Sequence, residues 1–75
     1  MKNTKAYDVT NRIIDYEMGH LDDAKTLRLF SELIKTGMVW SLQGHYGRTA
    51  SAMIESGWLE RDGTITDKAE LNGIA

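Results

Sequence analysis

Three residues near position 20 have the types and spacing that a metal site would need. His20, Asp22 and Asp23 could together offer an imidazole nitrogen and carboxylate oxygens to a cation. Helix initiation explains the same aspartates more simply, because Asp22 is a natural N-cap and Asp23 complements the positive end of the helix dipole. We therefore expect no metal ion at this position.

A second group of chemically capable residues surrounds His45. Ser41 precedes it and Arg48 follows it at helical spacing, so a nucleophile and a base could lie close together. On a helix, this spacing more simply places the side chains on one solvent-facing side. The run from Gly44 to Gly47 could cradle a phosphate, but neither a preceding strand nor a Walker lysine accompanies it. We expect a chain that is not an enzyme and needs no cofactor.

The same segment contains the residue types that anchor protein interfaces, since Trp, Tyr and Arg are enriched at such sites. We predict a partner-binding surface made of Trp40, Gln43, His45, Tyr46 and Arg48. For Trp40 and Tyr46 the alternative is a place in the hydrophobic core. For Arg48 the alternative is an ion pair with Glu55 or Asp15.

Acidic residues gather around the start of the second predicted helix, at Asp15, Glu17, Asp22 and Asp23. Such a group is typical of a solvated face combined with helix caps. A docking site for a basic partner is the alternative.

Composition limits the classes of function. The chain has 75 residues and zero cysteines, which predicts a single domain, 1–75, held by packing without disulfides or thiolate zinc sites. Nine Lys plus Arg against eleven Asp plus Glu give a net charge of -2, which does not favour binding to a polyanion. No apolar run approaches a membrane span or the core of a signal peptide. We expect a cytoplasmic protein with no membrane contact.

The positions of these residues depend on a predicted central helix, Val39–Ser56. Its apolar stripe consists of Val39, Leu42, Tyr46, Ala50 and Met53, with Gln43 and Ile54 at the edges. Gly44 and Gly47 lie inside this helix, where each costs about 1 kcal/mol relative to alanine. We interpret both as close-packing glycines, and a break of the helix near Gly44 is the alternative.

Two amphipathic helices are predicted before the central one. After a frayed leader, Met1–Lys5, the apolar spacing predicts a helix over Ala6–Met18 that ends at Gly19. A second helix, Asp23–Thr36, ends at Gly37 in the left-handed conformation. Its buried face is predicted to consist of Leu27, Leu29, Phe30, Leu33 and Ile34.

The C-terminal part predicts a different element. Asp62-Gly63 between two short apolar runs is the signal of a type I′ turn, so we expect a β-hairpin over 58–66. A short terminal helix follows over 67–73, with Ala69 and Leu71 pointing inward. The predicted fold class is mainly α: a compact three-helix domain with a short C-terminal β-hairpin, whose tail could be that of a small winged helix.

The most distinctive run reads TGMVWSLQGHYGR, from Thr36 to Arg48. With the acidic turn Glu17–Asp22 and the apolar face of the second helix, it makes the segment from Ile13 to Trp58 resemble small proteins and domains of unknown function encoded by tailed bacteriophages. The shared pattern is TGxxWxLQGHYGR. This resemblance implies a phage origin and expression inside an infected bacterium, and it implies no activity.

Two functions remain open. In the first, the chain is a phage accessory protein that binds a host bacterial protein and modulates or inhibits it, in transcription or in a defence system such as CRISPR. In the alternative, helix, glycine turn, helix and hairpin form a compact helix-turn-helix or winged-helix-like DNA-binding regulator. Arg48 would be the one cation on its reading helix, so few phosphates would be neutralised. A homodimer fits either function.

Overall fold

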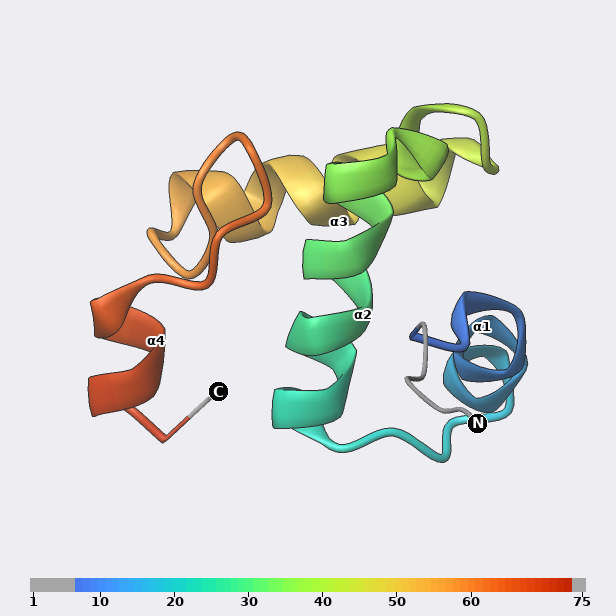
Figure 1. The fold of residues 1–75 in the computed structure, drawn as a ribbon, viewed down its shortest axis with the longest axis horizontal. Coiled ribbons are helices and arrows are strands. Elements are labelled where there is room, and N and C mark those ends of the chain that lie inside the picture. Colours follow the sequence, from blue (N-terminus) through green and yellow to red (C-terminus); the bar gives the residue numbers. More distant parts are fainter. Residues whose placement is uncertain (1–6, 74–75) are drawn as a thin grey trace, which may run out of the picture.

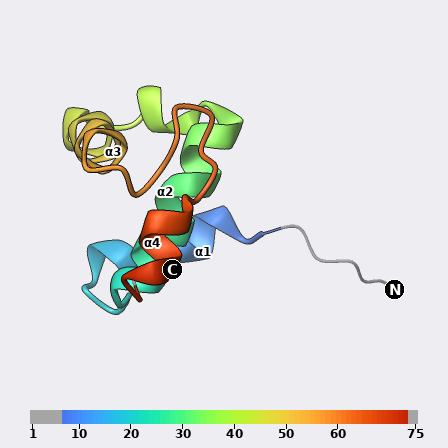
Figure 2. The same ribbon diagram turned by 90° about the vertical axis from the view of Figure 1, so that its left-hand side faces the viewer.

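The computed structural model describes residues 7–73, and these are mainly helical. The elements in chain order are α1 (Val9–Glu17), α2 (Asp23–Thr36), a 3₁₀ turn η1 (Met38–Trp40), α3 (Gly44–Glu55) and α4 (Asp67–Leu71). α2 stands in the centre between α1 and α4, and α3 crosses the C-terminal end of α2 (Figures 1 and 2). The predicted leader, Met1–Lys5, lies outside the described residues.

α2, and not the segment after it, organises the core. Its predicted buried face is confirmed in full. The core consists of Leu27, Leu29, Phe30, Leu33, Ile34, Val39, Tyr46, Ala50, Leu59 and Ala69. Half of these residues come from α2, because a central helix buries a wider stripe than a helix that packs on one side only. α1 and α3 then cover α2 with partly buried side chains, including Ile13, Tyr16 and Met53.

The predicted continuous helix over Val39–Ser56 is wrong. The chain forms η1, leaves helical geometry over residues 41–43, and begins α3 at Gly44. Gln43 has the extended backbone of an N-cap residue, with φ -55° and ψ 152°, although its side chain makes no capping hydrogen bond. The break near Gly44 is therefore the correct alternative. A glycine is least costly at a helix end, where it interrupts no established turn.

The other helix boundaries follow local capping signals. The carboxylate of Asp8 accepts a hydrogen bond from the backbone of Asn11, so α1 begins later than the predicted Ala6, which lies outside the described residues. Asp22 caps α2 in the same way, as predicted. Gly37 ends α2 with φ +80°, which confirms the left-handed end.

The predicted hairpin over 58–66 is also wrong. Within residues 7–73 this stretch contains one isolated antiparallel bridge, between Leu59 and Ile65, and no strand. The turn is closed by the Gly63 N–H, which donates to the carbonyl of Glu60 at 2.9 Å. Gly63 has φ +96° but Asp62 does not have a positive φ, so the turn is not type I′.

The reason for this difference is a tertiary contact between Gly63 and α2. The hydroxyl of Ser31 donates to the Gly63 carbonyl at 2.5 Å, and both residues are buried. A Cβ at position 63 would lie 2.6 Å from the Ser31 carbonyl oxygen. The loop is thus held on α2 by the Ser31 side chain, with the Gly63 backbone packed closely against that helix.

The terminal helix begins at residue 67, as predicted, but it ends at Leu71, before the predicted residue 73. The Thr66 hydroxyl accepts from the Ala69 backbone, so α4 covers Asp67–Leu71. The predicted inward position of Leu71 is wrong, because its side chain is 86% exposed. The predicted inward position of Ala69 is confirmed, because this residue is buried in the core.

Candidate functional site around Trp40

Trp40 ends η1 and lies on the surface of the molecule. Its side chain is 58% exposed, so the core alternative for this residue is wrong. The ring rests on α3 at Gly47, where an added Cβ would lie 3.6 Å from ring atoms Cε3 and Cζ3. A Cβ at this distance makes an ordinary van der Waals contact, so the Trp40 ring does not require a glycine at position 47, and the structure does not support its interpretation as a close-packing glycine.

A groove of about 410 Å³ runs beside the Trp40 ring. Its walls are Trp40, Ser51, Ile54, Glu55 and Arg61. The first residue comes from η1, the next three from α3, and Arg61 from the loop after α3, which turns back beside that helix (Figure 1). The groove thus has two large apolar side chains and one charge of each sign. We call these five residues the Trp40 groove.

The two charges of the Trp40 groove have no ion-pair partner within residues 7–73. The salt bridges in this part of the chain are Arg12–Asp15 at 2.6 Å and Arg28–Glu32 at 3.3 Å. Glu55 and Arg61 are both exposed. They are therefore available to charged groups outside the molecule, at a site where an exposed tryptophan supplies apolar contact area.

Gln43 and Arg48 are exposed, as the partner-binding prediction requires, but neither lines the Trp40 groove. Within residues 7–73, Arg48 forms no ion pair with Glu55 or Asp15. A Cβ at Gly44 would lie 3.0 Å from Nη1 of Arg48, which is the end of a flexible side chain. The prediction of Gly44 as a close-packing glycine is therefore wrong, because the Arg48 guanidinium that approaches it can move away.

Tyr46 does not belong to the surface. It is 2% exposed and lies in an aromatic cluster with Tyr16 of α1 and Phe30 of α2. Its hydroxyl donates to Oε2 of Glu17 at 2.5 Å. Burial, followed by the hydrogen bond and charge of Glu17, raises the pKa of Tyr46 above its usual value of 10.0. The core alternative is correct for this residue, and its place in the predicted binding surface is corrected accordingly.

His45 occupies an intermediate position. Its ring is half-buried, with its centroid 4.1 Å from that of Tyr46 and 6.3 Å from that of Tyr16. The imidazole therefore packs on the edge of the aromatic cluster. The predicted set divides into Trp40, Gln43 and Arg48 on the surface and His45 and Tyr46 at or inside the core.

A second groove, of about 320 Å³, lies on the opposite flank of α3. Its walls are Asp23, Thr26, Leu27, Thr49, Ala52, Met53, Ser56 and Trp58. Lys68 contacts two of these residues: its Nζ lies 4.9 Å from the centroid of the Trp58 ring and donates to the Ser56 carbonyl at 2.6 Å. This tryptophan is thus occupied by a contact within the chain, in contrast to Trp40.

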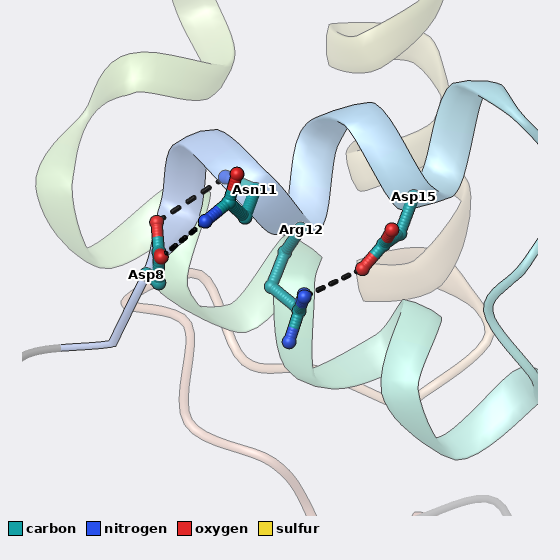
Figure 3. Close-up of polar contacts among 4 residues, drawn as sticks. All are labelled: Asp8, Asn11, Arg12 and Asp15. Atoms are coloured by element: carbon teal, nitrogen blue, oxygen red, sulfur yellow. Dashed lines mark hydrogen bonds and ion pairs between the residues drawn. The ribbon is translucent and has the colours of Figure 1, made fainter.

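The acidic residues around the α1–α2 turn mainly stabilise the fold. Asp15 pairs with Arg12, and Figure 3 shows this pair beside the Asp8 cap of α1. Glu17 accepts from Tyr46, and Asp22 caps α2. Across residues 7–73, no three or more His, Cys, Asp or Glu side chains gather where they could share a metal ion. These contacts favour the capping interpretation over a docking site for a basic partner.

Sequence reasoning missed part of the Trp40 groove. Ile54 packs partly buried against the core, as its predicted place at the edge of the apolar stripe requires, and it also lines the groove. No local signal places Glu55 and Arg61 on one groove. The return of the loop anchored at Gly63 brings the guanidinium of Arg61 to this side of α3.

None of the helices in residues 7–73 is both long enough and apolar enough to cross a membrane.

The comparisons with known proteins identify a family without an assigned function. A family model described as a domain of unknown function, DUF7417, matches residues 3–74. Neither a curated protein nor a solved structure matches the chain.

Proposed function

We propose that this chain, which belongs to the DUF7417 family, is a small accessory protein of a tailed bacteriophage that acts by binding a protein of the infected bacterium. The target would be a component of transcription or of a defence system such as CRISPR, and the chain would modulate or inhibit it. The TGxxWxLQGHYGR run supports the phage assignment through its resemblance to phage-encoded domains. The docking surface would combine the Trp40 groove with the exposed side chains of Gln43 and Arg48.

The observation that carries this proposal is the exposure of Trp40. A tryptophan buries roughly 150 to 250 Å² when it is covered, and it is among the residues most enriched at the energetic centres of interfaces. Here 58% of the side chain faces solvent beside a groove. Folding alone gains little from an indole in this position, because most of its apolar surface stays in water.

A protein partner fits this surface better than a nucleic acid does. Arg48 on α3 and Arg61 on the following loop are exposed, but Glu55 lines the same groove as Arg61, and the chain carries a net charge of -2. Strong binding to phosphates needs several cations on one face. The wing expected for a DNA-binding alternative is reduced to the single bridge between Leu59 and Ile65.

The test is affinity capture from the bacterial host with the tagged chain and with Trp40→Ala. We expect a bacterial protein that is retained by the original chain and lost with Trp40→Ala. Leu71→Ala is the matched control, since it removes an even more exposed apolar side chain on α4, far along the chain from the Trp40 groove. It should retain the partner.

Two results would contradict the proposal that the chain binds a bacterial protein through this surface. The proposal fails if no protein is retained above background while the purified chain retards duplex DNA at about 150 mM salt, where weak surface electrostatics are screened. It also fails if Trp40→Ala, shown by circular dichroism to be folded, retains the same protein as the original chain.

A further inference from the structure

The Trp40 groove is complementary to itself. An interface between two identical chains related by a twofold axis uses the same patch on both copies, so each group must find its counterpart within that patch. The groove meets this condition, because it contains apolar Trp40 and Ile54 and one charge of each sign, Glu55 and Arg61. Both charges are exposed and lack an ion-pair partner within residues 7–73.

We propose that, when no host protein is bound, a second copy of this chain covers the Trp40 groove in a twofold dimer. The axis passes between Glu55 and Arg61, so that Glu55 of each copy faces Arg61 of the other. One pair of residues thereby forms two ion pairs. The Trp40 and Ile54 side chains of both copies form the apolar centre of the interface.

Charge is what selects a second copy as the occupant. A surface with charges of one sign would repel its own copy. A surface with one acid and one base attracts its own copy, because a twofold axis can place the acid of each copy opposite the base of the other. The groove is small, and interfaces of low area are weak. We therefore expect a dissociation constant on the order of micromolar or weaker, so that a host protein with higher affinity can displace the second copy.

This proposal concerns the same surface as the proposed function but does not require it. Dimer formation and binding of a host protein are competing states of one groove. If the chain stays monomeric, the host-binding proposal is unaffected; if the dimer forms and no host protein binds, the dimer proposal stands alone.

The experiment is analytical ultracentrifugation of the purified full chain from about 1 µM to about 1 mM, a range that brackets weak association. The expected result is a concentration-dependent rise from the 8.4 kDa monomer toward twice that mass. Glu55→Arg and Arg61→Glu should each raise the dissociation constant at least about tenfold, because each brings like charges together at the interface.

The double variant Glu55→Arg/Arg61→Glu should regain the dimer, since the exchanged charges again face opposite partners. An equimolar mixture of the two single variants should also associate, through the ion pairs that the two chains can form between them. Glu70→Arg and Lys25→Glu are matched control reversals at exposed positions outside the groove, and they should associate as the original chain does.

A spectroscopic measurement follows the interface directly. In Trp58→Phe, Trp40 is the one remaining tryptophan, because the chain has two. Its emission should shift to shorter wavelength as concentration rises, in parallel with the mass. A monomer at every concentration overturns the proposal, as does a dimer that persists in both single variants or a folded double variant that remains monomeric.

Discussion

Trp40 and Tyr46 lie six positions apart in one segment, yet Trp40 lies on the surface and Tyr46 lies in the hydrophobic core. Tyr46 is buried among Tyr16 and Phe30 and donates to Glu17. Trp40 has most of its surface in solvent and rests on Gly47. Residue type therefore does not distinguish an exposed aromatic from a core aromatic. The distinction comes from the neighbours that other helices supply.

The largest expected difference is in stability after truncation of the two aromatics. Tyr46→Ala should lower the free energy of unfolding by about 3 to 5 kcal/mol, because it leaves a cavity between α1, α2 and α3. Trp40→Ala should cost about 1 kcal/mol or less, since an exposed side chain loses few contacts. Urea denaturation of the two variants and the original chain measures this difference. Equal losses would mean that Trp40 is part of the core.

The second expected effect concerns the loop that forms one wall of the Trp40 groove. Gly63→Ala should cost about 2 to 4 kcal/mol, because the new Cβ meets the Ser31 backbone and because alanine is strained at a positive φ. Gly73→Ala is the control: it has a similar φ of +72° and nothing within 4 Å. Gly73→Ala should lose only the free energy that a positive φ costs alanine, about 1 to 2 kcal/mol. If the two variants lose the same stability in urea, the Ser31 contact does not restrict position 63.

A third, smaller effect is a dependence of stability on alkaline pH. The pKa of Tyr46 is raised in the folded chain, so above about pH 10 the unfolded chain loses its phenolic proton first and the folded state loses stability as pH rises. Below that pH this contribution is fully present. Tyr46→Phe removes the group, so its free energy of unfolding should fall less steeply between pH 9 and pH 11, a range set by the reference pKa of about 10. Parallel curves would contradict the burial and the Glu17 contact of this hydroxyl.

The smallest expected effect tests the glycine beneath Trp40. Gly47→Ala should stabilise the chain by up to about 1 kcal/mol, because its Cβ would make an ordinary 3.6 Å contact with the indole and alanine favours the helix. Thermal unfolding measures the gain. Gly47→Leu should displace the indole and change the emission of Trp40, while the core around Tyr46 is unaffected. A large loss of stability in Gly47→Ala would show that the space above Gly47 is tighter than 3.6 Å.

Part of the candidate site could be predicted from residue types alone. Trp40, Gln43 and Arg48 were expected at a surface, and the structure leaves them exposed. Glu55 and Arg61 could not be placed together, because their proximity depends on a loop whose anchor is a contact between Gly63 and Ser31, on a helix far earlier in the chain. The Asp62-Gly63 signal predicted the position of the turn but not its type, because the type depends on the same contact between Gly63 and Ser31.

Local sequence signals were sufficient to predict α2, its caps at Asp22 and Gly37 and its buried face, and the lack of cysteines excludes disulfides. These features depend on hydrogen bonds and periodicities within a few residues, which local composition records. Only the tertiary structure decided that the segment after Gly37 breaks before Gly44, that Tyr46 is buried while Trp40 is exposed, and that the loop packs on α2 without forming strands. These outcomes depend on the burial of side chains from distant elements, whose combined free energy overrides local preference.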